Sequence, residues 1–303
     1  MDMKLGFIGT GVMGKAMAGH LQKAGHELFV YNRTKSKTDE LVANGAIWAE
    51  TPQKVAKSAE VIFTMVGYPK DVEEIYYGPQ GIFQADVKGK VLVDFTTSTP
   101  TLAEKIYQTA KEKGADSLDA PVSGGDLGAK NATLTIMVGG DRAVYDKILP
   151  LFEIVGKTFN YQGTAGKGQH TKMANQIMIA GTMTGMTEML VYANKAGLNL
   201  EQVLDTLAGG SASNWSMINY SPRILREDFT PGFFVKHFIK DLKIALDEAK
   251  KMDLNLPATQ KAYELYEQLA ELGFENDGTQ SLIKLFWHEG KKTLKKGKEF
   301  TEN

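Results

Sequence analysis

The sequence Lys4-Leu5-Gly6-Phe7-Ile8-Gly9-Thr10-Gly11-Val12-Met13-Gly14 decides the fold. Residues 4–8 predict a buried strand, and residues 13–24, with apolar side chains at helical spacing, predict a helix. Glycines at GxGxxG spacing between a strand and a helix are typical of a turn that binds a dinucleotide pyrophosphate. The first glycine permits the bend, the second admits the phosphate and the third allows close helix packing, while the helix N-terminus offers N–H groups to the anion. We therefore expect the whole turn to bind a cofactor, through Gly9, Thr10, Gly11, Val12, Met13 and Gly14.

The residues that close the second predicted strand, residues 27–31, indicate which nicotinamide cofactor binds. An NAD site usually has an acidic residue there, about 20 residues beyond the glycines, to bind the ribose 2′-hydroxyl. This chain has Asn32, Arg33 and Thr34 instead. An acid would repel a 2′-phosphate, whereas a guanidinium with a neighbouring amide and hydroxyl would bind it. The sequence therefore predicts a preference for NADP(H), with NAD(H) accepted as well if Arg33 is solvated or stacks on adenine.

The composition predicts a globular protein with two domains. A chain of 303 residues can hold two cores, and its 43% hydrophobic and 23% charged residues are ordinary values. The net charge of −1 gives no basic footprint, so we expect neither nucleic acid nor a membrane as a partner. The chain contains no cysteine, which excludes disulfides, thiolate nucleophiles and cysteine-based metal sites, and we expect no metal ion.

The two ends of the chain lead to an expectation about its location. The first strand begins at residue 4, which leaves no room for a signal peptide, and no apolar run approaches the length of a membrane span. We therefore expect a cytoplasmic protein. Residues 291–303 are rich in lysine, and we interpret them as a solvated tail rather than as a nucleic-acid patch.

Strand-like and helix-like segments alternate through residues 1–163. This alternation predicts an α/β fold, a Rossmann-type doubly wound sheet that is mostly parallel, carries helices on both faces and binds ligands at the carboxyl ends of its strands. After residue 163 the strand signals vanish, and we expect an all-α second domain over residues 164–290, joined by one long helix, that provides a substrate cleft. Such helical faces suggest burial in a homodimer or homotetramer. The helical patterns cover residues 169–196, 200–208, 238–252, 258–271 and 280–287.

Lys172 and Asn175 lie three residues apart, and therefore on one face, near the start of the long helix. The glycines just before them can bring this face against the ligand edge of the first domain. A lysine that is partly desolvated near other positive charge loses proton affinity, so it can act as a general acid or base near neutral pH. Hydride chemistry on an alcohol needs such a group, because the hydroxyl proton must leave as the hydride is transferred.

Two further segments carry candidate substrate ligands. Residues 119–125 read Asp-Ala-Pro-Val-Ser-Gly-Gly, which presents a hydroxyl and unhindered N–H groups after a strand. Such a segment is either a cradle for a small carboxylate or a plain glycine turn. Lys240-Asp241, at the start of a later helix, either adds a second cation near the cofactor or substrate or forms a surface ion pair.

Four motifs, in this order and at this spacing, resemble those of the β-hydroxyacid dehydrogenase family, which includes 3-hydroxyisobutyrate dehydrogenase and tartronate semialdehyde reductase. They are residues 6–14, residues 119–125, residues 163–175 and Lys240-Asp241-Leu242. The resemblance extends from residue 5 to about residue 287. One departure is Val66-Gly67, where many members have Leu-Pro.

The resemblance implies a role for each matching residue. Lys172 would be the catalytic acid/base. The residues that would bind the substrate are Ser123, Gly124, Gly125, Asn175 and Lys240. The residues that would line the cofactor, in addition to the glycine turn, are Met65, Val66, Gly67, Thr97 and again Lys240.

Residues and resemblance together predict an NADP(H)-preferring oxidoreductase that interconverts a small 3-hydroxy acid and its semialdehyde by hydride transfer. Its partner would be a small-molecule carboxylate substrate. One alternative is a glyoxylate or succinic semialdehyde reductase. Another is a non-catalytic NADP-binding regulator, which would have little reason to retain both Lys172 and Asn175. A phosphogluconate-type decarboxylating dehydrogenase shares the fold, but the chain is short for its larger helical domain.

Overall fold

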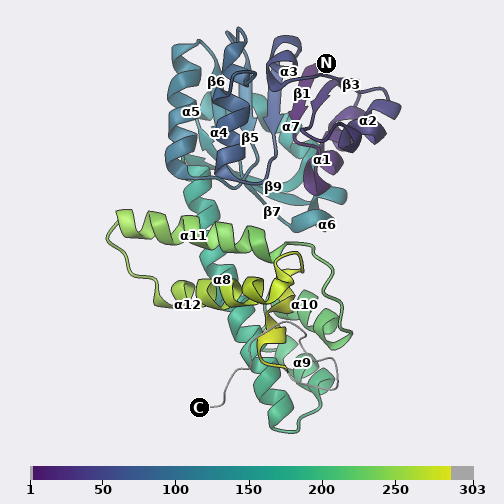
Figure 1. The fold of residues 1–303 in the computed structure, drawn as a ribbon, viewed down its shortest axis with the longest axis vertical. Helices are drawn as coiled ribbons and strands as arrows, with labels where there is room; N and C mark the ends of the chain where they lie inside the picture. Colours follow the sequence, from purple (N-terminus) through teal and green to yellow (C-terminus); the bar gives the residue numbers. More distant parts are fainter. Residues whose placement is uncertain (1–2, 288–303) are drawn as a thin grey trace. The chain divides into compact units, whose positions relative to one another are not determined.

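The computed structural model describes residues 3–287 and divides into two compact units (Figure 1). The first unit ends at Asn175 and the second begins at Gln176. The lysine-rich residues 291–303 lie outside the described residues, so their interpretation as a solvated tail stays a prediction. Within residues 3–287, no helix combines the length and the apolar character that a membrane span requires.

The first unit alternates strands and helices along the chain, as the sequence predicts. Its strands are β1 (Lys4–Ile8), β2 (Glu27–Tyr31), β3 (Ile47–Trp48), β4 (Val61–Thr64), β5 (Val91–Asp94), β6 (Asp116–Asp119), β7 (Val122–Ser123), β8 (Leu134–Gly140) and β9 (Gly156–Gly163). Its helices are α1 (Val12–Lys23), α2 (Asp39–Ala43), α3 (Pro52–Ser58), α4 (Pro69–Tyr77), α5 (Pro100–Glu112), α6 (Gly125–Lys130), α7 (Arg142–Val155) and the first turns of α8 (Lys167–Lys195), with the 3₁₀ helices η1 (Lys35–Thr38) and η2 (Ile82–Gln84).

Threonine–proline pairs begin two of these helices. The Thr51 hydroxyl accepts a hydrogen bond from the backbone N–H of Lys54 at the start of α3, and the Thr99 hydroxyl accepts one from Leu102 at the start of α5. The proline that follows each threonine occupies the first helical turn, where its missing N–H costs nothing.

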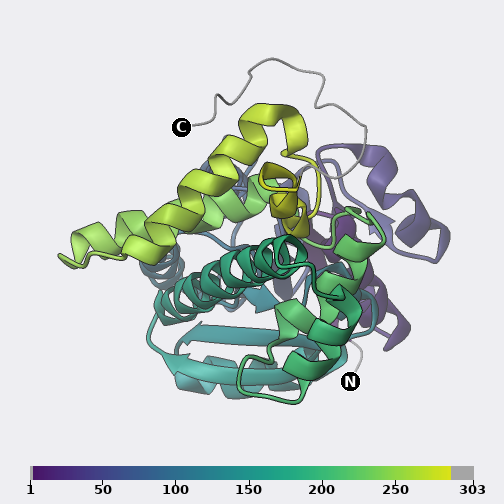
Figure 2. The ribbon, with the colours of Figure 1, turned by 90° about the horizontal axis from the view of Figure 1, so that it is seen from below.

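The strands form one sheet in the order β3-β2-β1-β4-β5-β6-β8-β7, with β9 beside β8. β1 to β6 run parallel to one another, whereas β8 runs antiparallel to its neighbours β6 and β7. Figure 2 shows the parallel neighbours β8 and β9 side by side. The chain extends from β1 in one direction to β2 and β3 and in the other to β4, β5 and β6, which is the doubly wound arrangement. The fold class predicted from the sequence is therefore confirmed.

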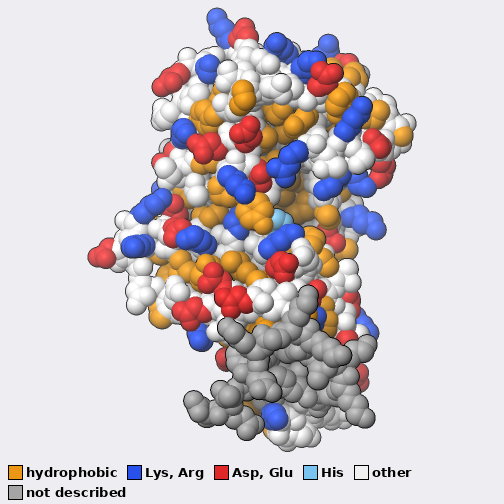
Figure 3. All heavy atoms as spheres, viewed as in Figure 1, with side chains coloured by type: hydrophobic (Ala, Val, Ile, Leu, Met, Phe, Trp, Pro, Cys, Tyr) orange, Lys and Arg blue, Asp and Glu red, His pale blue; other side chains and the backbone are white. Residues whose placement is uncertain are grey.

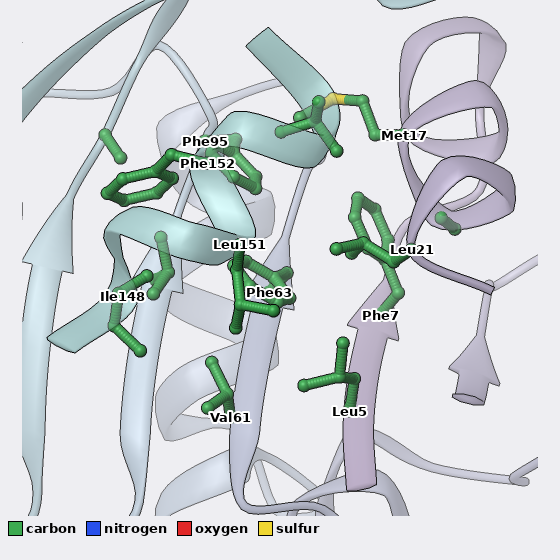
Figure 4. Close-up of a cluster of buried hydrophobic side chains, with 14 of the residues drawn as sticks. Leu5, Phe7, Met17, Leu21, Val61, Phe63, Phe95, Ile148, Leu151 and Phe152 are labelled. Carbon is green, nitrogen blue, oxygen red and sulfur yellow. The ribbon is translucent and has the colours of Figure 1, made fainter. Parts of the chain in front are cut away.

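Helices cover both faces of the sheet because neighbouring strand residues point to opposite faces. Leu5 and Phe7 of β1 belong to the core under α1 and α7, whereas Ile8 belongs to the core under α3, α4 and α5. On the first face, the ring of Phe63 lies 6.1 Å from that of Phe7 and 5.4 Å from that of Phe95, between ring centroids. Figure 4 shows these rings beside Met17 and Leu21 of α1 and Phe152 of α7.

The second unit is helical, as the sequence predicts. It contains the remainder of α8, then α9 (Leu200–Ala208), α10 (Trp215–Leu225), α11 (Val235–Lys251), α12 (Pro257–Leu269), the π turn η3 (Ala270–Phe274) and the 3₁₀ helix η4 (Thr279–Leu285). Figures 1 and 2 show α11 beside α12, where the ring of Phe238 meets that of Tyr266 at 4.9 Å in a T-shaped contact. Within residues 176–287 the strand-type pairing is limited to one bridge, between Phe234 and Gly278.

The sequence predicts the long elements better than the short ones. β3 and β7 are two residues long and show no periodicity, and α10 contains Pro222 in its interior, so the sequence reveals none of the three. The predicted final helix over residues 280–287 is instead the 3₁₀ helix η4.

The boundary between the two compact units lies within a helix. The sequence places it between residues 163 and 164, where the strand signals end, whereas the compact units meet within α8, between Asn175 and Gln176. The physical reason is that the first turn of α8 is hydrogen-bonded to Asp119 and to Thr96 of the first unit. The predicted domain limits of 1–163 and 164–290 stay a prediction.

Charges of both signs are spread over the first unit. On the face drawn in Figure 3, Lys and Arg side chains lie among Asp and Glu side chains across this unit. Exposed ion pairs such as Lys15–Glu40 (2.6 Å between Nζ and Oε2) and Lys105–Glu73 (2.9 Å between Nζ and Oε1) join opposite charges. Such exposed pairs contribute little to stability.

The core under α1 supplies a test of the packing. We expect Leu21→Ala to lower the free energy of unfolding by about 2–5 kcal/mol, because Leu21 is fully buried and the truncation leaves a cavity. Leu127→Ala on α6 is the matched control, since that side chain is 61% exposed and its truncation should change the free energy by about 0.5 kcal/mol or less. Urea unfolding followed by circular dichroism measures both. Equal midpoints for the two variants would contradict the described core.

Candidate active site

Five parallel strands end at the same edge of the sheet, and most of the candidate residues follow directly after them. Gly9 follows β1, Asn32 follows β2, Met65 follows β4, Phe95 follows β5 and Ala120 follows β6. β1 lies between β2 and β4, which is the point where the strand order reverses and where such sheets bind ligands. The sheet therefore brings segments far apart in the sequence to one ligand edge.

The three glycines of the turn after β1 have three different surroundings. Gly9 has a φ of +97°, and a Cβ there would lie 2.1 Å from the carbonyl oxygen of Met65. A Cβ on Gly14 would lie 1.9 Å from the carbonyl oxygen of Gly9, so α1 packs directly on the turn. A Cβ on Gly11 would meet nothing within 4 Å. The packing of the protein thus requires glycine at the first and third positions, whereas the second faces open space, and the approach of a pyrophosphate there stays a prediction.

Asn32 supports this turn. Its side-chain Oδ1 accepts a hydrogen bond from the backbone N–H of Thr10 (3.0 Å), and its Nδ2 donates to the carbonyl of Thr34 (3.0 Å). The sequence assigns Asn32 to the cofactor through its amide, but both ends of this amide already bond within the protein. Asn32 therefore shapes the turn, and contact with the cofactor through the amide is not needed to explain its presence.

Arg33 extends from the same loop into solvent. Its side chain is 87% exposed, and its Nη1 lies 3.5 Å from Oδ1 of Asp71. Asp71 also caps α4, since its Oδ2 accepts a hydrogen bond from the backbone N–H of Tyr68 (3.1 Å). An anion that binds Arg33 would compete with this carboxylate, which sequence reasoning missed because Asp71 is 38 residues away.

The loops after β4 and β5 are joined beside the glycine turn. The backbone N–H of Val66 donates to the hydroxyl of Thr96 (3.0 Å), and a Cβ on Gly9 would lie 3.1 Å from Cγ1 of Val66. Thr97, between the buried residues Thr96 and Ser98, is itself half-buried. The predicted cofactor residues Met65, Val66 and Thr97 are therefore on adjoining loops, and Gly67 follows Val66 in the first of them.

A buried acid, missed by sequence reasoning, lies beneath these loops. Oδ1 of Asp94, the last residue of β5, accepts hydrogen bonds from the hydroxyl of Thr64 (2.7 Å) and from the backbone N–H of Thr96 (3.0 Å). Burial raises the pKa of Asp94 to about 6, against the opposing effect of these hydrogen bonds. The only sequence signal for this buried acid is that an otherwise apolar strand ends with an aspartate.

A second buried acid holds the start of α8. Oδ1 of Asp119 accepts a hydrogen bond from the backbone N–H of Gly166 (2.8 Å), and its Oδ2 accepts one from Gln169 (2.8 Å). A Cβ on Gly168 would lie 2.4 Å from the carbonyl oxygen of Met137 and 2.6 Å from that of Asp119, so this helix start touches the strands directly. Burial raises the pKa of Asp119, while the backbone N–H groups act in the opposite direction.

Lys172 follows one turn later on α8. It is 6% exposed and is the only buried lysine among residues 3–287. A lysine is seldom buried without a specific reason, because desolvation of an ammonium group is costly. Asn175 lies on the same face and is half-buried. Burial thus distinguishes Lys172 from every other lysine within residues 3–287.

The proposed carboxylate cradle begins where β7 ends. Ser123 pairs with Thr135 of β8, and the next two residues, Gly124 and Gly125, have φ values of +127° and +62°. These left-handed conformations suit glycine and turn successive N–H groups out of the strand. The segment is therefore a defined turn that favours glycine at both positions.

Lys240 belongs to the second unit, on α11. Its Nζ lies 2.8 Å from Oδ1 of Asp241, and the two side chains are only 12% and 2% exposed. Oδ2 of Asp241 accepts a hydrogen bond from Nε2 of Gln176 (2.7 Å). The two residues therefore form an ion pair, as one of the two alternatives predicts, but the pair is largely buried and not on the surface.

No cluster of three or more His, Asp or Glu side chains suited to a metal ion occurs within residues 3–287. The described edge carries an open side at Gly11, two buried carboxylic acids and one buried lysine.

Two family models match the chain almost end to end. The model described as the NAD-binding domain of 6-phosphogluconate dehydrogenase matches residues 4–163. The model described as the NAD-binding domain of NADP-dependent 3-hydroxyisobutyrate dehydrogenase matches residues 166–286.

Similar proteins carry related names. The uncharacterized oxidoreductase YkwC of Bacillus subtilis is 52% identical over 94% of this chain and 99% of its own. The 2-hydroxy-3-oxopropionate reductase of Escherichia coli is 42% identical over 89% of this chain and 92% of its own. Among solved structures, a 3-hydroxyisobutyrate dehydrogenase of Mycobacterium tuberculosis, described with L-serine, is similar with a TM-score of 0.87 and 27% identity, over 94% of this chain and 99% of that one. The chain therefore belongs to the β-hydroxyacid dehydrogenase family of NAD(P)-dependent oxidoreductases.

Proposed function

We propose that the protein prefers NADP(H) and interconverts a small 3-hydroxy acid, of the size of 3-hydroxyisobutyrate or tartronate, and its semialdehyde. The observation that carries this proposal is the burial of Lys172 on the first turns of α8, beside the ligand edge to which the start of that helix is bonded. The names of the similar proteins support the substrate class, since one is a 2-hydroxy-3-oxopropionate reductase and another a 3-hydroxyisobutyrate dehydrogenase.

The residues around the glycine turn fit a nicotinamide dinucleotide. The open side of Gly11 and the N–H groups at the start of α1 would hold the pyrophosphate, and the loops of Val66 and Thr97 would line the nicotinamide end. When bound, the nicotinamide supplies the hydride acceptor for oxidation and the hydride donor for reduction.

Lys172 would move the proton that accompanies the hydride. In oxidation its neutral amine accepts the proton of the substrate hydroxyl as the carbonyl forms. In reduction its ammonium form donates a proton to the carbonyl oxygen. The positive charge of the ammonium group would also stabilise the developing alkoxide, and this interaction is stronger the less water the site admits.

The substrate carboxylate would bind the segment after β7. The hydroxyl of Ser123 and the N–H groups of Gly124 and Gly125 can converge on one anion, because both glycines adopt left-handed conformations. Asn175, on the face of α8 that carries Lys172, would orient the substrate, and Lys240 of the second unit would add a cation.

Lys172→Ala tests the proton-transfer role. We expect the variant to bind NADPH normally, by fluorescence titration, and to lose turnover by about 10²–10⁴-fold, the usual contribution of a general acid or base. Lys167→Ala is the matched control, because Lys167 is exposed on the same helix. Turnover within a few-fold of wild type in Lys172→Ala would remove the lysine from its role. A wild-type protein that binds NADPH but turns over no semialdehyde would instead favour a regulator.

Arg33→Ala tests the cofactor preference. We expect NADPH binding to weaken about ten- to a hundredfold, since a hydrogen bond to a charged group contributes about 1.5–3 kcal/mol, while NADH binding changes little. Asp71→Asn should act in the opposite direction and tighten NADPH relative to NADH, because it removes the acid that pairs with Arg33 and leaves an oxygen for the Tyr68 N–H. Isothermal titration with both cofactors measures these changes. Equal losses of both cofactors in Arg33→Ala would show that the guanidinium does not bind the 2′-phosphate.

A further inference from the structure

Gln169 is a fully buried side chain whose amide is bonded at both ends. Its Nε2 donates a hydrogen bond to the carbonyl oxygen of Thr96 (2.8 Å), and its Oε1 accepts one from the backbone N–H of Ser98 (3.0 Å). These two bonds lie on either side of Thr97. A single amide of α8 therefore fastens the loop after β5 at two points.

The same residue is fixed to a third element through its backbone. The N–H of Gln169 donates to Oδ2 of Asp119 at the end of β6 (2.8 Å). The loop that it fastens is in turn bonded to Asp94 and to Val66, through the N–H and the hydroxyl of Thr96 (3.0 Å each). A continuous set of buried hydrogen bonds thus runs from the loop after β4, through the loop after β5, to the first turn of α8.

Lys172 lies three residues after Gln169, so the two side chains are neighbours on one face of the helix. We propose that Gln169 is a positioning residue, which fixes Lys172 relative to the loop of Thr96, Thr97 and Ser98 that would line the cofactor. The inference rests on the proposed role of Lys172 in proton transfer. Gln169 touches neither substrate nor cofactor in this scheme, and it acts only through the helix and the loop.

The variant Gln169→Glu distinguishes a positioning role, which needs the hydrogen bonds, from a role in which the side chain only fills buried volume. Glu has nearly the same shape as Gln, so the buried volume stays filled. When protonated, Glu donates to the Thr96 carbonyl and accepts from the Ser98 N–H, as Gln does. When ionised, it has no proton for Thr96 and places two oxygens in contact. Burial raises the pKa of a carboxyl group. The carboxylates of Asp94 and Asp119 raise it further, whereas the ammonium of Lys172 lowers it.

The experiment measures kcat at saturating substrate and cofactor for the variant and for the wild type. The compared quantity is the kcat of the variant divided by the kcat of the wild type, at each pH across the accessible range. We expect this ratio for Gln169→Glu to be near one at the acidic end and to fall about ten- to a hundredfold as the carboxyl group ionises, a loss typical of a small misplacement of reacting groups. The ratio cancels the titration of groups that the substitution leaves unaffected. Gln108→Glu, on the exposed face of α5, is the matched control and should give a flat ratio.

A double-mutant comparison shows whether the effect passes through Lys172. Gln169→Leu removes both amide bonds and should lower kcat by a similar factor at every pH. In the Lys172→Ala background the same substitution should leave the residual kcat unchanged, because there is no lysine left to position. A loss that persists undiminished in that background would overturn the inference and make Gln169 merely structural.

The failures of the two proposals are distinguishable. If Lys172→Ala keeps wild-type turnover, the proposed proton-transfer role fails, whatever Gln169→Glu does. If Lys172→Ala is inactive while the ratio for Gln169→Glu stays flat and near one, the positioning role of Gln169 alone is wrong.

Discussion

The candidate site depends on the contact between the carboxyl group of Asp119 and the start of α8. A helix begins with N–H groups that have no partner within the helix, and its N-terminus favours a negative charge. Asp119 meets both requirements from the end of a strand, since it accepts hydrogen bonds from Gly166 and Gln169. Because Gly168 has no side chain, the helix can approach the sheet closely enough for these bonds to form. The direction and rotation of α8, and hence the position of Lys172, follow from this contact.

The glycine turn could be predicted from the sequence because its requirements are local. The chain must bend at Gly9, α1 must pack closely on the turn at Gly14, and the space beside Gly11 must stay open. Each of these conditions concerns residues between one strand and one helix. The parallel sheet could be predicted for the same reason, since apolar runs that alternate with helical patterns leave few other arrangements. The long helix and the helical second unit followed from periodicity alone.

The hydrogen bonds that hold the site together could not be predicted, because they join residues far apart in the sequence. Gln169 bonds to Thr96, 73 residues away, and Asp94 to Thr64, 30 residues away. Nothing in a single sequence indicates which of many glutamines will be buried and fully bonded. The hydrogen bond that Asn32 accepts from the Thr10 N–H, 22 residues away, is long-range for the same reason.

The division of the chain within α8 has a consequence for how such proteins diversify. A recombination point after Asn175 leaves the glycine turn, Asp119, Gln169 and Lys172 on a polypeptide segment from a single parent. The helical segment that follows, with Lys240 and its buried partner Asp241, is then inherited as a separate block. Exchange of blocks at this point varies the helical part while every hydrogen bond that anchors the start of α8 is passed on intact.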